Sequence, residues 1–94
     1  MVLQDQELSL RNAVSVSEAG LQAIHAGSNQ IDMSPLKAVD SSAVAVMLAW
    51  QRQAQSSNQA LQFVGVPASL MSLISLYGLT EFFDLVEATS FERH

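Results

Sequence analysis

Strand-like segments alternate with helix-like segments along this chain of 94 residues. The order is strand, helix, strand, helix, strand, helix. Such an alternation is typical of a mostly parallel sheet whose crossover connections are right-handed. A chain of this length has room for one modest hydrophobic core, so the pattern predicts a single α/β domain.

The three strand-like segments differ in strength. Residues 2–12 alternate weakly, and the alternation places Leu8 and Leu10 on the same side. Residues 30–33 predict a short strand, and residues 61–64 give the strongest strand signal in the chain.

The first helix is predicted from a capping pattern. Ser15 is followed three residues later by Glu18, the spacing at which each side chain bonds the other residue's backbone N–H. Gly27 can adopt the left-handed backbone conformation that ends a helix. We therefore expect a short helix over about residues 16–26.

Two further helices follow from apolar spacing. Apolar residues recur at helical intervals from Ala43 to about Gln55. The third helix is predicted from Pro67, which suits a first helical turn, and from an apolar stripe that runs from Leu70 to Tyr77. Gly78 is expected to end this helix. Beyond it, residues 79–85 are expected to pack back on the core, and residues 92–94 to fray.

Composition narrows the class of protein. Hydrophobic residues make up 49% of the chain and charged residues 14%, so disorder is excluded. Either Ser, Gln and Asn cover the surface, or an apolar patch is left for a partner. Both interpretations stay open at this point.

The charge distribution argues against nucleic acid and against membranes. The formal net charge is −5, and the basic residues are isolated: Arg11, Lys37, Arg52 and Arg93. Binding to phosphates or to an anionic bilayer requires clustered Lys and Arg. The longest apolar run, Ala43 to Trp50, is far short of the ~20 residues that span a bilayer. Asp5 and Glu7 stand where a signal peptide carries cations, so we expect a cytoplasmic protein.

The usual constellations of an enzyme are missing. There is no cysteine, and the two histidines are His25, expected on a helix surface, and His94. No nucleophile elbow, glycine-rich phosphate loop or cluster of metal ligands is present in the sequence. We therefore predict a protein without catalytic residues, cofactor or metal.

The turn Asp40-Ser41-Ser42 opens the second helix and is the main candidate site. In a parallel sheet, functional residues lie beyond the carboxyl ends of strands, and the turn Gly65-Val66-Pro67 shares that position. Side chains of this kind cap helix N-termini, which is a purely structural role. Alternatively, an exposed Ser41 would place an anion or phosphoryl group at the free N–H groups of the helix.

The second helix carries a further hint. Ala45, Val46 and Ala49 fall opposite its core stripe, which predicts a small, apolar outer face that another protein can approach closely. Burial of this helix on more than one side is the alternative. The predicted partner-binding residues are Asp40, Ser41, Ser42, Ala45, Val46 and Ala49.

Residues 31–48, IDMSPLKAVDSSAVAVML, resemble the signature of the STAS domain, in which an IDLS strand leads to VDSSG and an apolar helix. Residues 61–67 and 76–79 resemble the last strand and helix end of that family. The resemblance extends from about residue 7 to residue 83. It implies a STAS-like domain over residues 1–94, with a mostly parallel or mixed sheet of about four strands and about three to four helices.

The resemblance implies two possible functions. Anti-sigma factor antagonists are phosphorylated by a partner kinase on the serine that corresponds to Ser41. The small subunit of the Mla-type ABC system binds the transporter ATPase and supports the phospholipid traffic that maintains outer-membrane lipid asymmetry. The run from Ile31 to Trp50 looks closer to this second branch, which implies a cytoplasmic protein at an inner-membrane complex. Ala43 replaces the family's glycine, and its methyl group is expected to hinder a kinase.

Overall fold

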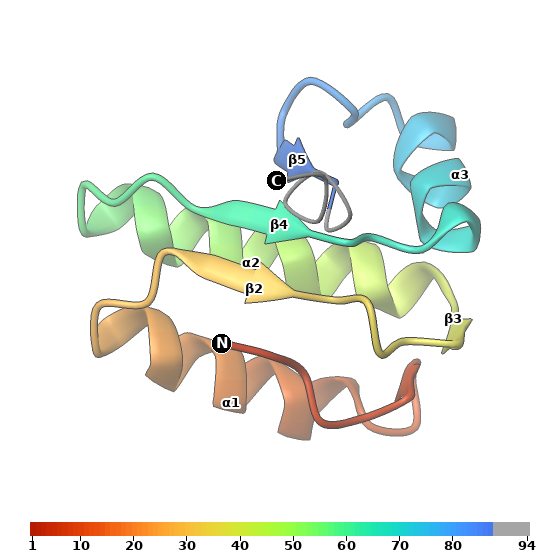
Figure 1. Ribbon diagram of the computed structural model, residues 1–94, viewed down its shortest axis with the longest axis horizontal. Coiled ribbons are helices and arrows are strands. Elements are labelled where there is room, and N and C mark those ends of the chain that lie inside the picture. The colour runs from red at the N-terminus through yellow and green to blue at the C-terminus, as the bar shows by residue number, and fades with distance from the viewer. Residues whose placement is uncertain (88–94) are drawn as a thin grey trace, which may run out of the picture.

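The three-dimensional structure is a computed structural model that describes residues 1–87 (Figure 1). Its elements are β1 (Glu7–Leu8), α1 (Ala13–His25), β2 (Gln30–Asp32), β3 (Ala38–Val39), α2 (Ser41–Ser56), β4 (Gln62–Val64), α3 (Ala68–Leu76) and β5 (Asp84–Val86). The predicted alternation of strands and helices is confirmed, and the short strands β3 and β5 are added to it. The end that was expected to fray, residues 92–94, lies outside the described residues.

All strand pairs of the described chain are parallel. β4 lies between β2 and β5 in a three-stranded sheet, where Ile31 is aligned with Phe63 and Phe63 with Leu85. β1 and β3 form a separate pair. The α/β class with a parallel sheet is thus confirmed, but its strands are shared between two sheets.

The N-terminal segment runs first beside β2 and then beside β3. The backbone N–H of Leu3 donates to the carbonyl of Asp32 (3.0 Å), and that of Lys37 donates to the carbonyl of Gln6 (2.7 Å). Between these contacts stands Pro35, which has no N–H to offer a ladder. The long N-terminal strand expected from the sequence is therefore reduced to β1 and one isolated bridge.

Leu8 and Leu10 do not share a side, so that prediction is wrong. Leu8 is fully buried, whereas Leu10 is 81% exposed. The chain leaves the strand at Ser9 and enters a turn, where the two-residue period of a strand no longer applies.

The first helix begins three residues earlier than its capping pattern predicts. Asn12 is the N-cap of α1, and Ser15 lies exposed inside the helix. The side chain of Asn12 makes no cap hydrogen bond, because its Oδ1 accepts from the N–H of Ser9 (3.0 Å) and its Nδ2 donates to the carbonyl of Glu7 (2.8 Å). The folded turn before the helix therefore decides where α1 begins.

The third helix lies where it was predicted, but Pro67 is its N-cap and not part of its first turn, and Tyr77, predicted to end the apolar stripe, is 52% exposed. α3 follows Pro67, and Leu70 and Ile74 of its apolar stripe are fully buried. Gly78 has a φ of 71°, the left-handed conformation that ends a helix and that glycine adopts without strain.

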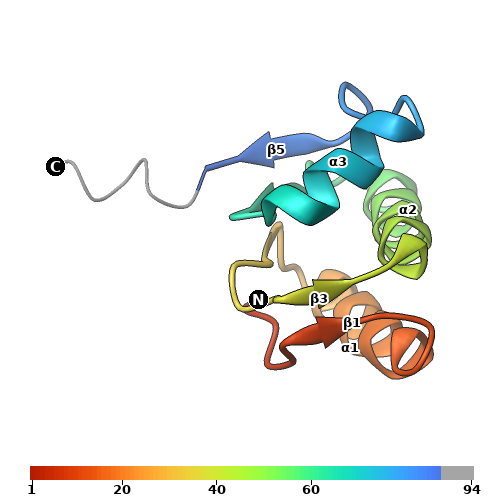
Figure 2. The same cartoon turned by 90° about the vertical axis from the view of Figure 1, so that its right-hand side faces the viewer.

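The core lies between the strands and the helices α1 and α2, which cover one face of the sheet (Figures 1 and 2). Trp50 of α2 is fully buried at its centre and stacks on Phe63 of β4, with ring centroids 6.4 Å apart. Its indole Nε1 donates to the carbonyl of Ser17 in α1 (3.0 Å). Gly20 leaves the space in α1 that the indole occupies.

The segment after α3 packs back on the core, as expected, first through a turn that carries Phe83 and then as the strand β5. Phe83 is buried and meets Phe63 edge to face, with centroids 5.3 Å apart. Its neighbour Phe82 is 43% exposed. β5 then pairs with β4 through the tertiary fold, although its own short sequence carries little alternation.

Candidate functional site

The Asp40 carboxylate joins two segments at the start of α2. Its Oδ1 accepts from the backbone N–H of Ser42 (2.8 Å), which is the N-cap bond predicted from the sequence. Its Oδ2 accepts from the backbone N–H of Leu10 (3.1 Å), thirty residues earlier in the chain. The bond from Leu10, and secondarily those from Ser42, holds the pKa of Asp40 below its usual value, against the opposing effect of desolvation. Asp40 is therefore an anion that ties the turn before α1 to the N-terminus of α2.

The two serines of the turn differ in exposure. Ser41 is exposed in the first turn of α2, and Ser42 is partly buried. Ala43, the next residue, is fully buried in the core. The methyl group of Ala43 therefore lies in the protein interior and not on the surface that a kinase would approach.

A groove of about 450 Å³ separates the N-terminal halves of α1 and α2. The α2 side of this groove consists of Ser42, Ala45, Val46 and Ala49. Ala45 is exposed and Ala49 is half-buried, so the prediction of small residues near the surface holds for both. Val46 is only 5% exposed, and its predicted outward position is wrong. It is buried because α1 packs beside α2 and makes Val46 part of the groove wall.

Large apolar side chains on the α1 side of this region remain exposed. Val14, in the first turn of α1, lines the groove and is 74% exposed. Leu10, whose backbone is bonded to Asp40, is more exposed still. Sequence reasoning missed both residues, because it placed Leu10 in a strand and left Val14 between that strand and a helix expected from about residue 16. The turn that exposes Leu10 depends on a bond to a residue distant in sequence.

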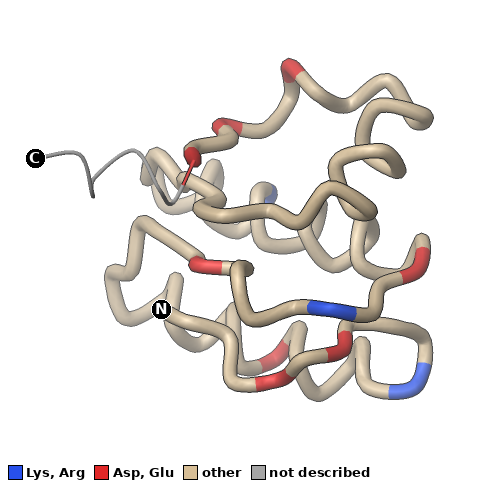
Figure 3. Tube along the Cα trace, turned by 45° about the vertical axis from the view of Figure 1, so that its right-hand side comes forward, with Lys and Arg blue, Asp and Glu red and all other residues tan. Residues whose placement is uncertain are grey.

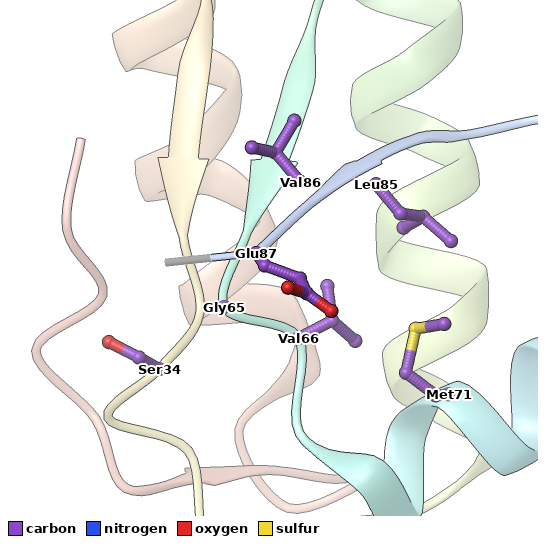
Figure 4. Close-up of a pocket in the computed structure, with 7 residues that line it drawn as sticks. All are labelled: Ser34, Gly65, Val66, Met71, Leu85, Val86 and Glu87. Carbon is purple, nitrogen blue, oxygen red and sulfur yellow. The ribbon is translucent and has the colours of Figure 1, made fainter. Parts of the chain in front are cut away.

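A second cavity, of about 550 Å³, lies beside the turn Gly65-Val66 that links β4 to α3 (Figure 4). Val66, Met71 and Leu85 supply apolar walls, and Ser34 and Glu87 supply the polar side chains. A cavity therefore lies at this turn, beyond the carboxyl end of β4, where the sequence predicts functional residues. The described residues that line it include no histidine or lysine that would activate Ser34.

Charged side chains are sparse and form no basic patch on the described part of the chain (Figure 3). Arg11 pairs with Glu7 at 3.7 Å on an exposed surface. His25 is exposed on α1, as predicted. Residues 1–87 contain no cluster of side chains that could hold a metal ion. Nor does any helix within them have the length and apolarity needed to cross a membrane.

Comparisons with known proteins agree with this architecture. The crystal structure of a proposed anti-sigma factor antagonist from Thermotoga maritima matches with a TM-score of 0.78 at 19% sequence identity. The match covers 98% of this chain and 82% of that one. No curated protein sequence matches the chain. The sequence model of the family described as "Mlab, STAS domain" matches residues 5–87, and the protein therefore belongs to the STAS domain family.

Proposed function

We propose that this protein is a non-enzymatic accessory subunit that binds the cytoplasmic ATPase of an ABC-type phospholipid transporter. The observation that carries the proposal is the apolar groove between α1 and α2, which opens beside the exposed Ser41. Exposed apolar surface of this kind is typical of a protein–protein interface. The family match over residues 5–87 supports the same assignment.

In this proposal the contact surface consists of the α2 N-terminus and the groove. Asp40, Ser41 and Ser42 form its edge, and Ala45, Val46 and Ala49 form its wall. The small side chains of Ala45 and Ala49 allow the partner's backbone to approach closely. The protein itself stays in the cytoplasm and reaches the inner membrane only through the transporter.

The proposal is tested by co-purification with the ATPase subunit encoded by the same organism. Wild-type protein should form a stable complex, and Ala45→Arg and Ser41→Arg should lose it because each places a long cation in the contact surface. Gln55→Arg, exposed at the far end of the same helix, is the matched control and should retain the complex. A wild-type protein that does not bind the ATPase, and whose deletion leaves outer-membrane integrity unchanged, would show that the proposal is wrong.

A phosphorylation switch at Ser41 is the second candidate function. Ser41 is exposed at a helix N-terminus, and the matched Thermotoga structure is described as an anti-sigma factor antagonist. Phosphate there would add about −1.5 to −2 charge beside the Asp40 carboxylate and repel an acidic partner surface. Intact-mass analysis after incubation with cell lysate and ATP, with Ser41→Ala as control, detects the phosphorylated form. Its absence would count against this function.

A further inference from the structure

Leu10 is an apolar side chain held outside the core by an ordered turn. It is 81% exposed, the highest value among the large hydrophobic residues described. A single exposed leucine on a loose loop would need no explanation. The turn that carries Leu10 is different, because hydrogen bonds determine its conformation.

Three of the hydrogen bonds within the turn involve Asn12 and fix the shape of the turn. The backbone N–H of Asn12 donates to the carbonyl of Ser9 (3.1 Å), and the N–H of Ser9 donates to Oδ1 of Asn12 (3.0 Å). The amide of Asn12 also donates to the carbonyl of Glu7 (2.8 Å). A side chain presented by such a turn loses little conformational freedom when a partner covers it, which favours binding.

A further bond sets where the turn lies. The N–H of Leu10 donates to Oδ2 of Asp40, while Oδ1 of the same carboxylate caps α2 at Ser42. Leu10 therefore stands beside the N-terminus of α2, next to the proposed contact surface. Val14, exposed in the first turn of α1, continues the apolar surface into the groove.

The charges around the turn specify the partner's chemistry. The amide of Asn12 donates to the carboxylate of Asp5 (3.1 Å), and Glu7 and Asp40 also border the turn. Two cations lie near these three carboxylates: Arg11, which pairs with Glu7, and Lys37, whose backbone is bonded to that of Gln6. The surroundings of Leu10 thus carry a net negative charge, which complements a basic rim on the partner.

We propose that Leu10 is an anchor that inserts into an apolar pocket with a basic rim on the protein partner, and that Asp40 is its positioning residue. This inference rests on the proposed function. It adds to Asp40, at the edge of the proposed contact surface, the task of holding Leu10 in place, and the leucine makes the apolar contact with the partner.

The test measures the affinity of the purified full chain for the ATPase subunit by calorimetry. We expect Leu10→Ala to weaken binding about 30-fold, the effect of losing an interface hot spot. Leu76→Ala is the matched control, since Leu76 is 76% exposed but lies at the end of α3. It should change affinity less than about twofold.

The positioning role of Asp40 is tested by a double-mutant cycle. Asp40→Asn keeps an acceptor for the helix cap but offers one acceptor oxygen to two N–H donors, so the bond to Leu10 is lost. We expect about 3- to 10-fold weaker binding in the wild-type background and a clearly smaller loss, from the missing charge alone, in the Leu10→Ala background. A purely structural role of Asp40 would give additive losses instead.

The outcomes separate the two proposals. If wild-type protein does not bind the ATPase, the proposed function fails and the anchor assignment fails with it. If wild-type protein binds and Leu10→Ala binds equally well, only the anchor assignment is overturned. A larger loss from Leu76→Ala than from Leu10→Ala would likewise overturn it and place the contact on α3. The fluorescence of the buried Trp50 verifies that each variant is folded.

Discussion

The indole of Trp50 occupies the space that a side chain on Gly20 would need. A Cβ atom built on Gly20 would overlap Cε2, Nε1 and Cζ2 of that indole. Because Gly20 lies in α1 and Trp50 in α2, this contact sets how closely the two helices pack. The groove proposed to bind the partner lies between the same two helices, toward their N-termini.

We expect Gly20→Ala to destabilise the protein although alanine is the better helix former. Overpacking of a core costs about 1–3 kcal/mol, whereas replacing glycine in a helix gains about 1 kcal/mol. Chemical denaturation measures the net loss. Ala19→Gly, at the exposed neighbouring position, isolates the helix-propensity effect. A variant Gly20→Ala that is stabilised by the amount Ala19→Gly loses would refute the steric argument.

Two adjacent phenylalanines should respond very differently to truncation. Phe83 is buried against Phe63, so Phe83→Ala should lower the free energy of unfolding by about 3–5 kcal/mol. Phe82→Ala removes a half-exposed ring, and we expect a loss of about 1 kcal/mol or less. Should Phe83→Ala prevent folding, Phe83→Leu provides a milder comparison. Equal effects at the two positions would contradict the packing of Phe83 against Phe63 described above.

Replacement of Ser15 distinguishes the two starting points of α1. As an N-cap, Ser15 would contribute about 1 kcal/mol, which Ser15→Ala would remove. As an exposed residue inside the helix, it should be replaced by alanine with a gain of a few tenths of a kcal/mol. Thermal unfolding followed by circular dichroism measures the difference. We expect the small gain.

The Asp40 carboxylate should make stability depend on pH in acid. Its pKa is lower in the folded protein than in the unfolded chain, where it is about 3.9. The stabilisation is therefore complete above the unfolded pKa and disappears as the pH falls through the folded pKa. Urea denaturation between pH 3 and 7 gives the free energy of unfolding of wild type and of Asp40→Asn. The two curves of free energy against pH should converge as the pH falls. A difference that stays constant with pH would show that the carboxylate charge contributes nothing.

Local signals sufficed wherever an element depends on its own residues. The α/β class, the helix that the turn Asp40-Ser41-Ser42 opens, a cap within that turn and the stop at Gly78 were all predicted, because spacing, capping and backbone preferences act within a few residues. The family resemblance added the STAS assignment. These features describe which elements form and in what order.

Other features needed the tertiary structure, because they depend on contacts between distant segments. The bond from Leu10 to Asp40 holds a turn that exposes a leucine, although alternation alone predicts burial beside Leu8. Val46 is buried because α1 lies against it, which the spacing within α2 does not reveal. Nothing in the sequence indicates why a glycine stands at position 20, and only the packing of the Trp50 indole against it gives the reason. The sequence by itself determined the three helices, the strands near residues 30–33 and 61–64 and the candidate turn, whereas only packing between elements decided which side chains face a partner.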